Sequence, residues 1–174
     1  MRILTVRQPW AWAIIHGGKD VENRARNIAG GYRGPVAIHV AREIDVHAIA
    51  TPSRIHPAFR EAADRYMAAN SDPLKGSPWM GGIGNIIGVV DLIDVHSASV
   101  IGGCGRMDRN CDEHPHGCRH HCSPWAMGPA PEGWYQHLVL ANPRPLSEPI
   151  PFKGALGLRR LDEAMVQRIE AAIA

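Results

Sequence analysis

The chain has 174 residues, of which 45% are hydrophobic and 21% are charged, with a formal net charge of +2. This length predicts a single domain over residues 1–174 and argues against two full domains. The sequence contains no apolar run long enough to span a membrane, and its first residues lack the apolar core of a signal peptide. We therefore expect a cytoplasmic protein and exclude a membrane-spanning one.

Positive charge is concentrated in the first 60 residues, which carry nine Lys and Arg against four Asp and Glu. A basic surface attracts partners that carry phosphate groups. The excess is small, so it indicates such a partner only weakly.

The first part of the chain predicts short strands around one helix. Pro9 stands where a helix can begin, and the glycines at 17 and 18 stand where it would end. β-Branched and apolar residues between glycine and proline turns indicate strands. The expected elements are strands over 3–6, 21–24 and 36–40 and a helix over 10–16.

The remaining elements are expected from the same kinds of pattern. The segment 57–69 has apolar residues at helical spacing, and 165–173 forms a second apolar stripe behind Asp162 as cap. Prolines limit the segment 149–152 to the edge of a sheet. We expect helices over 43–50, 57–69 and 165–173, strands over 83–95 and 134–140, and an edge segment over 149–152.

These elements predict an α+β fold in which a small mixed β-barrel is flanked by helices. Residues 97–133 show no convincing helix or strand pattern. A loop of that length is uncommon inside a compact domain unless some interaction ties it down. We therefore treat 97–133 as a long insertion, rich in Cys and His, in the barrel.

All of the cysteines of the chain lie in this loop, at Cys104, Cys111, Cys118 and Cys122. In a reducing compartment, clustered cysteines favour a metal over disulfides. The sequence thus predicts a structural zinc ion bound by the four cysteines, with His114, His116 and His121 as alternate ligands. Two disulfides, or free thiols, are the alternative. A catalytic metal is less favoured because four protein ligands leave zinc no open position.

A charged cluster follows the first helix, at Lys19, Glu22 and Arg24. On a strand, Glu22 and Arg24 point to the same face because side chains alternate with period two. The cluster either forms an exposed ion pair, which stabilises a protein by only about 0–1 kcal/mol, or builds a polar site in a cleft.

Motifs along nearly the whole chain, apart from the cysteine loop and parts of 43–80, resemble one known family. They are the opening strand and QPWA turn at 4–11, the pattern G-x-K-x-x-E-x-R at 17–24, the segments 32–34 and 88–94, the strand at Trp134 and the segment 151–154. Together they resemble the ASCH domain, named for activating signal cointegrator 1 homology, within the PUA-like superfamily. The cysteine loop is not part of the family pattern.

The resemblance implies a β-barrel whose cleft is floored by the first charged motif and binds RNA or a modified nucleobase. Arg24 and Lys19 would hold a phosphate or base carbonyl, Glu22 would accept a proton, and an aromatic ring would stack on a base. The expected nucleic-acid-binding residues are Arg7, Gln8, Trp10, Lys19, Glu22, Arg24, Tyr32 and Asp91.

Three other functions stay open at this point. Some ASCH proteins cleave RNA, and a ribonuclease would here use Lys19, Glu22 and Arg24 as catalytic residues. A short bacterial group hydrolyses an acetylated nucleoside, but Glu22 replaces the threonine that serves as its nucleophile. Lastly, the zinc loop would bind a protein partner if Trp125 and Met127 formed an exposed apolar patch.

Overall fold

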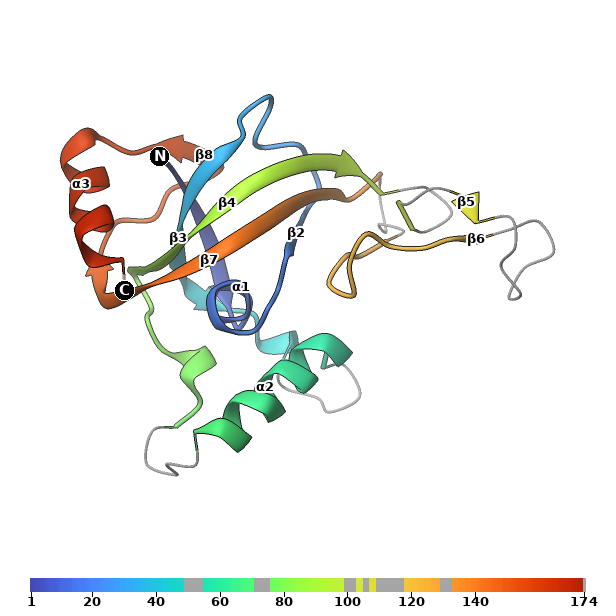
Figure 1. Ribbon diagram of the computed structural model, residues 1–174, viewed down its shortest axis with the longest axis horizontal. Helices are drawn as coiled ribbons and strands as arrows, with labels where there is room; N and C mark the ends of the chain where they lie inside the picture. Colours follow the sequence, from blue (N-terminus) through green and yellow to red (C-terminus); the bar gives the residue numbers. More distant parts are fainter. Residues whose placement is uncertain are drawn as a thin grey trace.

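The computed structural model of the chain describes residues 1–48, 55–70, 76–98, 103–104, 107–108, 118–128 and 133–173. Its elements are strands with a few helices between and after them, in agreement with the α+β prediction (Figure 1). They are β1 (Arg2–Gln8), α1 (Trp10–His16), β2 (Val21–Arg24), β3 (Gly34–Ile44), η1 (Val46–Ala48), α2 (Pro57–Ala69), η4 (Pro78–Met80), β4 (Asn85–Ser97), β5 (Met107–Asp108), β6 (Cys118–Arg119), β7 (Gln136–Pro151), β8 (Leu158–Arg160) and α3 (Glu163–Ala172).

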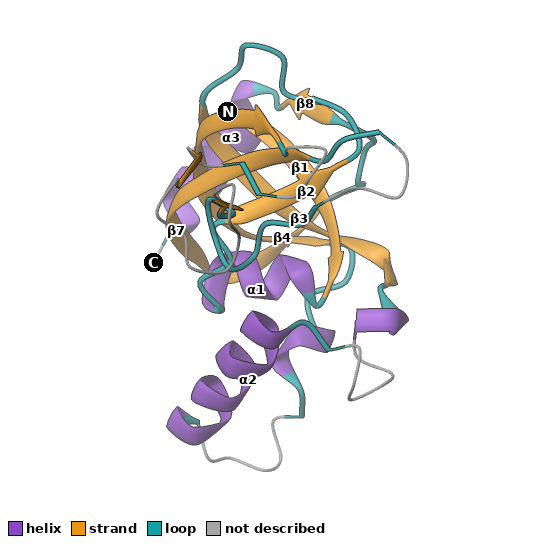
Figure 2. Cartoon of the chain, turned by 90° about the vertical axis from the view of Figure 1, so that its right-hand side faces the viewer, coloured by secondary structure: helices purple, strands orange, loops and turns teal. Residues whose placement is uncertain are grey.

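Six strands form one curved sheet in the order β2-β7-β4-β3-β1-β8. The β1–β3 pair is parallel, and the other neighbours are antiparallel. Within the described residues the edge strands β2 and β8 are not bonded to one another, so the barrel is open. Figure 2 shows the strongly curved strands, with α1 lying between the sheet and α2.

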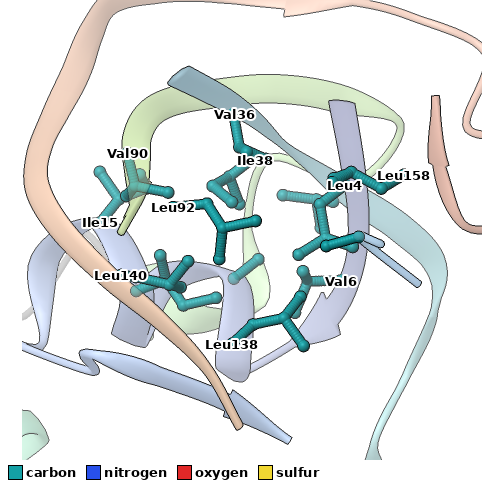
Figure 3. Close-up of a cluster of buried hydrophobic side chains, with 14 residues drawn as sticks. Leu4, Val6, Ile15, Val36, Ile38, Val90, Leu92, Leu138, Leu140 and Leu158 are labelled. Atoms are coloured by element: carbon teal, nitrogen blue, oxygen red, sulfur yellow. The ribbon is translucent and has the colours of Figure 1, made fainter. Parts of the chain in front are cut away.

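The largest apolar cluster lies inside the curve of the sheet. Alternate residues of β1, β3, β4 and β7 point inward, and α1 adds Ile14 and Ile15 to them (Figure 3). A second cluster packs α3 against the sheet around Ile169. A third, around Trp12 and Phe59, joins α1 to α2. Among the helices in the described residues, none is long and apolar enough to cross a membrane.

Most expected elements are confirmed, but three differ. The helix expected over 43–50 is wrong, because β3 continues to Ile44 and is followed only by the short η1. Ile44 pairs with Gln8 of β1, and this pairing keeps the backbone extended. The segment 149–152 is no separate strand; its first part is the end of β7, which there pairs with β4 alone. The loop 97–133 contains the two-residue strands β5 and β6.

Gly88 allows α1 to pack closely on β4. A Cβ at this position would lie 2.5 Å from Ile15 Cδ1 and 2.9 Å from the Arg144 carbonyl oxygen. We predict that Gly88→Ala destabilises the protein by about 1–3 kcal/mol, because the backbone oxygen cannot move away cheaply. Urea denaturation measures the change.

Gly31→Ala is the matched control, because a Cβ at Gly31 has no atom within 4 Å and the φ angle there is not left-handed. Its free energy of unfolding should be unchanged or slightly raised. Equal destabilisation by the two substitutions would contradict the close approach at Gly88.

Candidate functional site

The edge strand β2 presents the charged cluster. Glu22 and Arg24 lie on the same face, as the period of two predicts, and Arg24 Nη2 lies 3.0 Å from Glu22 Oε1. Pairing with β7 fixes this orientation, since Glu22 is the partner of Leu138 and Arg24 that of Gln136. The sheet therefore fixes the positions of Glu22 and Arg24 relative to one another.

Glu22 is also paired on its other side. Lys19 Nζ lies 3.4 Å from Glu22 Oε2, donates to the Val21 carbonyl, and lies 5.9 Å from the ring centroids of both Trp10 and Trp125. Only 5% of Lys19 and 8% of Glu22 is exposed, so this is no solvated surface pair. Burial lowers the pKa of Lys19, and the Glu22 carboxylate opposes that shift.

Arg24 links the cluster to β1. Its Nη2 also donates to the Thr5 carbonyl at 3.0 Å, while its Nε is buried and has no hydrogen-bond partner among the described residues. A buried donor without a partner costs about 1–3 kcal/mol, so such groups are rare in folded proteins. Arg24 thus offers one unused N–H group.

A cavity of about 780 Å³ opens over Glu22 and Arg24. Its walls come from β1, β2, β3 and the segment 152–157. Cations outnumber carboxylates in the lining: Arg7, Arg24, Arg42 and Lys153 against Glu22 and Glu43. A cavity lined by an excess of one charge focuses its field and attracts ligands of the opposite sign.

A threonine and a histidine lie side by side in this cavity. Thr5 and His39 are cross-strand partners in the β1–β3 pair, and Thr5 Oγ1 lies 3.2 Å from His39 Nδ1. His39 Nε2 lies 3.0 Å from the Phe152 carbonyl, so that nitrogen carries the proton and Nδ1 accepts one from Thr5. Burial lowers the pKa of His39, which keeps the ring neutral near pH 7.

The sequence-predicted binding residues fall into two groups. Arg7, Trp10, Glu22 and Arg24 line the cavity. Lys19 lies behind Glu22 and is not in the lining. Gln8 is 1% exposed, and its amide group bonds the Gly81 carbonyl and the Trp12 N–H, which is a structural role.

Tyr32 and Asp91 also lie outside the cavity lining. The Tyr32 hydroxyl donates to the Pro35 carbonyl, and Arg2 lies 4.3 Å above its ring. Asp91 accepts two hydrogen bonds from Arg144, at 2.7 and 3.2 Å, and one from Asn142. The binding roles expected for these two residues remain predictions.

The structure brings two of the predicted zinc ligands together with two histidines. The ligand atoms of His96, Cys104, Cys122 and His137 all lie within 4.8 Å of one another, an arrangement that can hold a metal ion. Burial, and then the neighbouring Cys104, raise the pKa of Cys122 to about 12, so a nearby cation is needed to form its thiolate.

The other predicted metal ligands are not part of this group. Cys111, His114 and His116 lie outside the described residues, as does the side chain of Cys118. His121 is described and lies beside the group, with its ring centroid 6.0 Å from that of His137. Sequence reasoning missed His96 and His137, and no local spacing signal marks them.

Trp125 and Met127 do not form the exposed apolar patch on which the protein-partner alternative depends. Only 6% of Trp125 is exposed, because it packs in the third cluster and stacks on His56 at a centroid distance of 5.5 Å. Met127 is 44% exposed.

No family model matches the sequence, and no curated protein does either. Solved structures do match. The ASCH protein from Zymomonas mobilis is 13% identical with a TM-score of 0.50, covering 99% of this chain and 95% of its own. A mutant form of that protein is 15% identical with the same TM-score, covering 99% and 98%. The chain therefore has an ASCH-type fold. The α+β architecture expected from the motifs is confirmed.

The structural role of Asp91 can be tested through the pH dependence of the free energy of unfolding. Its bonds to Arg144 and Asn142 hold the pKa of the carboxyl below its ordinary value of 3.8. Because the pKa of this carboxyl is lower in the folded state, its ionised form stabilises the protein at pH values above the ordinary pKa. This contribution is lost as the pH falls through the pKa of the folded state. We predict that Asp91→Asn lowers the free energy of unfolding most near pH 7, and that the difference shrinks below about pH 4.

Urea denaturation at a series of pH values measures that difference. A loss of stability that is the same at all pH values would show that the ion pair with Arg144 contributes nothing.

Proposed function

We propose that the protein binds single-stranded RNA or a modified nucleobase in the cavity over Glu22 and Arg24. The observation that carries this proposal is the Arg24 guanidinium, which lines a positively charged cavity and whose Nε has no hydrogen-bond partner among the described residues. The planar guanidinium of an arginine that lines such a cavity fits a phosphate or base carbonyl oxygen supplied by a ligand.

The size and lining of the cavity support such a ligand. Its volume of about 780 Å³ lies in the range of small-molecule sites. Trp10 and Phe152 both line it and offer rings for stacking, which is worth roughly 1–3 kcal/mol per base. Arg42 and Lys153 are exposed at the cavity and form none of the ion pairs found among the described residues, so their charge is available to phosphates.

The ASCH-type fold supports the same conclusion, because the PUA-like superfamily binds RNA or modified bases in a cleft of this kind. The proposal also includes zinc as the metal of the Cys/His group. Two thiolates and two imidazoles are a donor set typical of structural zinc sites.

The proposal predicts that removing the Arg24 guanidinium weakens binding. Arg24→Met keeps the apolar stem but loses the charged donors, and a charge-assisted hydrogen bond is worth about 1.5–3 kcal/mol. We expect the Kd for a short fluorescent single-stranded RNA to rise about tenfold or more, measured by fluorescence anisotropy. The Kd of the native protein should also rise with salt concentration.

Arg65→Met is the matched control. Arg65 lies on α2, pairs with Glu61 and is not in the cavity lining. The Arg65→Met substitution removes one positive charge, as Arg24→Met does, but at a position outside the cavity. The Kd should therefore stay nearly unchanged. RNA binding that is equally weakened by both substitutions would show a general charge effect and contradict the cavity as the site.

A second candidate function is hydrolysis of an acylated nucleoside, and the Thr5–His39 pair is the observation that favours it. The Thr5 hydroxyl donates to a neutral imidazole that is itself oriented by the Phe152 carbonyl. In such a reaction Thr5 Oγ1 would attack the acyl carbon and His39 Nδ1 would take the hydroxyl proton. That proton then passes to the departing amine, and water hydrolyses the ester that remains on Thr5.

Turnover is tested by incubating the protein with N4-acetylcytidine and, separately, with labelled RNA. For the second candidate we expect free cytidine with the native protein and at least a hundredfold less with Thr5→Val, which keeps the side-chain shape. RNA fragments that disappear with Glu22→Gln would instead identify a ribonuclease. Binding without any product supports recognition alone.

A further inference from the structure

Two histidines meet at the end of the longest strand pair. His96 of β4 and His137 of β7 are direct cross-strand partners, with ring centroids 5.4 Å apart. Figure 1 shows that this end of β4 and β7 faces the insertion that carries β5 and β6. The sheet itself thus fixes one half of a four-residue group.

The insertion supplies the other half. The Cys104 N–H donates to the His120 carbonyl at 3.0 Å, which joins two parts of the insertion that are distant in sequence. The Cys122 N–H lies 3.1 Å from Cys104 Sγ. Backbone N–H groups that donate to cysteine sulfur are the kind of surrounding contact that stabilises a metal-bound thiolate.

The distance between the ligand atoms of Cys122 and His137 fits a zinc ion bound to both. Cys122 Sγ lies 3.6 Å from His137 Nδ1. In a tetrahedral site with Zn–S of about 2.3 Å and Zn–N of about 2.0–2.1 Å, sulfur and nitrogen lie about 3.6 Å apart. The full set of ligand atoms lies within 4.8 Å, so only small shifts are needed to reach tetrahedral geometry.

Both imidazoles are already oriented to bind a cation. His137 Nε2 donates to the Met127 carbonyl at 2.8 Å, which leaves the lone pair of Nδ1 facing Cys122. His96 Nδ1 donates to Asp94 at 2.8 Å, while its Nε2 is buried and has no hydrogen-bond partner among the described residues. A carboxylate or carbonyl on the far nitrogen is the usual arrangement around zinc-bound histidine.

We propose that His96, Cys104, Cys122 and His137 form a complete structural zinc site, and that the ion clamps the segment 122–127 onto β2. This inference rests on the zinc included in the proposed function, but not on the nucleic-acid ligand. It replaces the four-cysteine ligand set expected from the sequence with two cysteines and two histidines.

The segment 122–127 lies behind β2, the strand that carries Glu22 and Arg24. Ser123 donates to Asp20, and the Trp125 N–H donates to Ser123 Oγ at 3.0 Å. Asn23 of β2 bonds both the Trp125 carbonyl and the Met127 N–H, each at 2.9 Å. The segment therefore covers the face of β2 opposite to Glu22 and Arg24.

Trp125 then connects the clamp to the charged cluster. Its ring lies 5.9 Å from Lys19 Nζ, on the buried side of Glu22. A segment held only by a few hydrogen bonds and two buried apolar residues would otherwise open readily. The binding free energy of a structural zinc ion is large enough to fold small domains, which is ample to hold this segment closed.

The ligand set is tested by measuring zinc in protein purified without chelators, using mass spectrometry of the metal. We expect one zinc per chain in the native protein and its loss in Cys104→Ser and Cys122→Ser. The matched controls Cys111→Ser, Cys118→Ser and His121→Ala should keep their zinc. Loss of zinc in either cysteine control would overturn the ligand set, as would a native protein without zinc.

Cobalt replacement covers the case in which the Cys104 and Cys122 variants do not fold. The Co²⁺ form of the native protein should show tetrahedral d–d bands and a sulfur charge-transfer band of the intensity that two thiolates give. The intensity that four thiolates give would overturn the proposal.

The clamp is tested separately by removing the metal. Chelation should make the Trp125 fluorescence accessible to iodide, with Trp125→Phe as the control that identifies the signal, and it should leave the secondary structure of the sheet intact. Unchanged quenching after complete zinc removal would overturn the clamp. None of these experiments uses RNA, so failure of the RNA-binding proposal would not be mistaken for failure of the zinc site.

Discussion

The buried carboxylate of Glu22, held between Lys19 and Arg24, is the constraint to which the rest of the site is adapted. Removing ions from water costs several kcal/mol for each, and attraction in the protein offsets this only when the geometry is good. Here each oxygen of the carboxylate faces one cation, at 3.4 Å and 3.0 Å. Because such a network adds little net stability, its position at the floor of a cavity favours a role in ligand recognition.

The two cations of this network have different roles. Lys19 is enclosed by Trp10, Trp125 and the Val21 carbonyl, so it acts as a positioning residue that holds Glu22 from behind. Arg24 lines the cavity, and its Nε has no hydrogen-bond partner in the part of the chain that the structure describes. A planar guanidinium can bond Glu22, the Thr5 carbonyl and a ligand at the same time, which a lysine cannot do with the same geometry.

Some of this arrangement follows from the sequence and some does not. Side chains alternate between the two faces of any strand, so Glu22 and Arg24 share a face whatever the place of β2 in the sheet. Apolar spacing alone locates α2. The pairs Thr5–His39 and His96–His137 depend on strand register, which is set by contacts between segments distant in sequence. For the same reason the helix expected over 43–50 is wrong, since pairing with β1 overrides the local preference of those residues. The cysteine spacing indicated a metal but could not reveal that the sheet brings His96 and His137 beside Cys104 and Cys122.

β2 connects the cavity with the insertion because its side chains point alternately to the two faces of the strand. Glu22 and Arg24 point to the cavity, whereas Asn23, between them, bonds the segment 122–127 on the other side. An edge strand of four residues has few contacts of its own, and β7 is its one strand partner among the described residues. Support from the insertion therefore stabilises the strand that carries Glu22 and Arg24. A zinc site at the base of the insertion would thus act on the cavity through packing alone, without any ligand atom entering it.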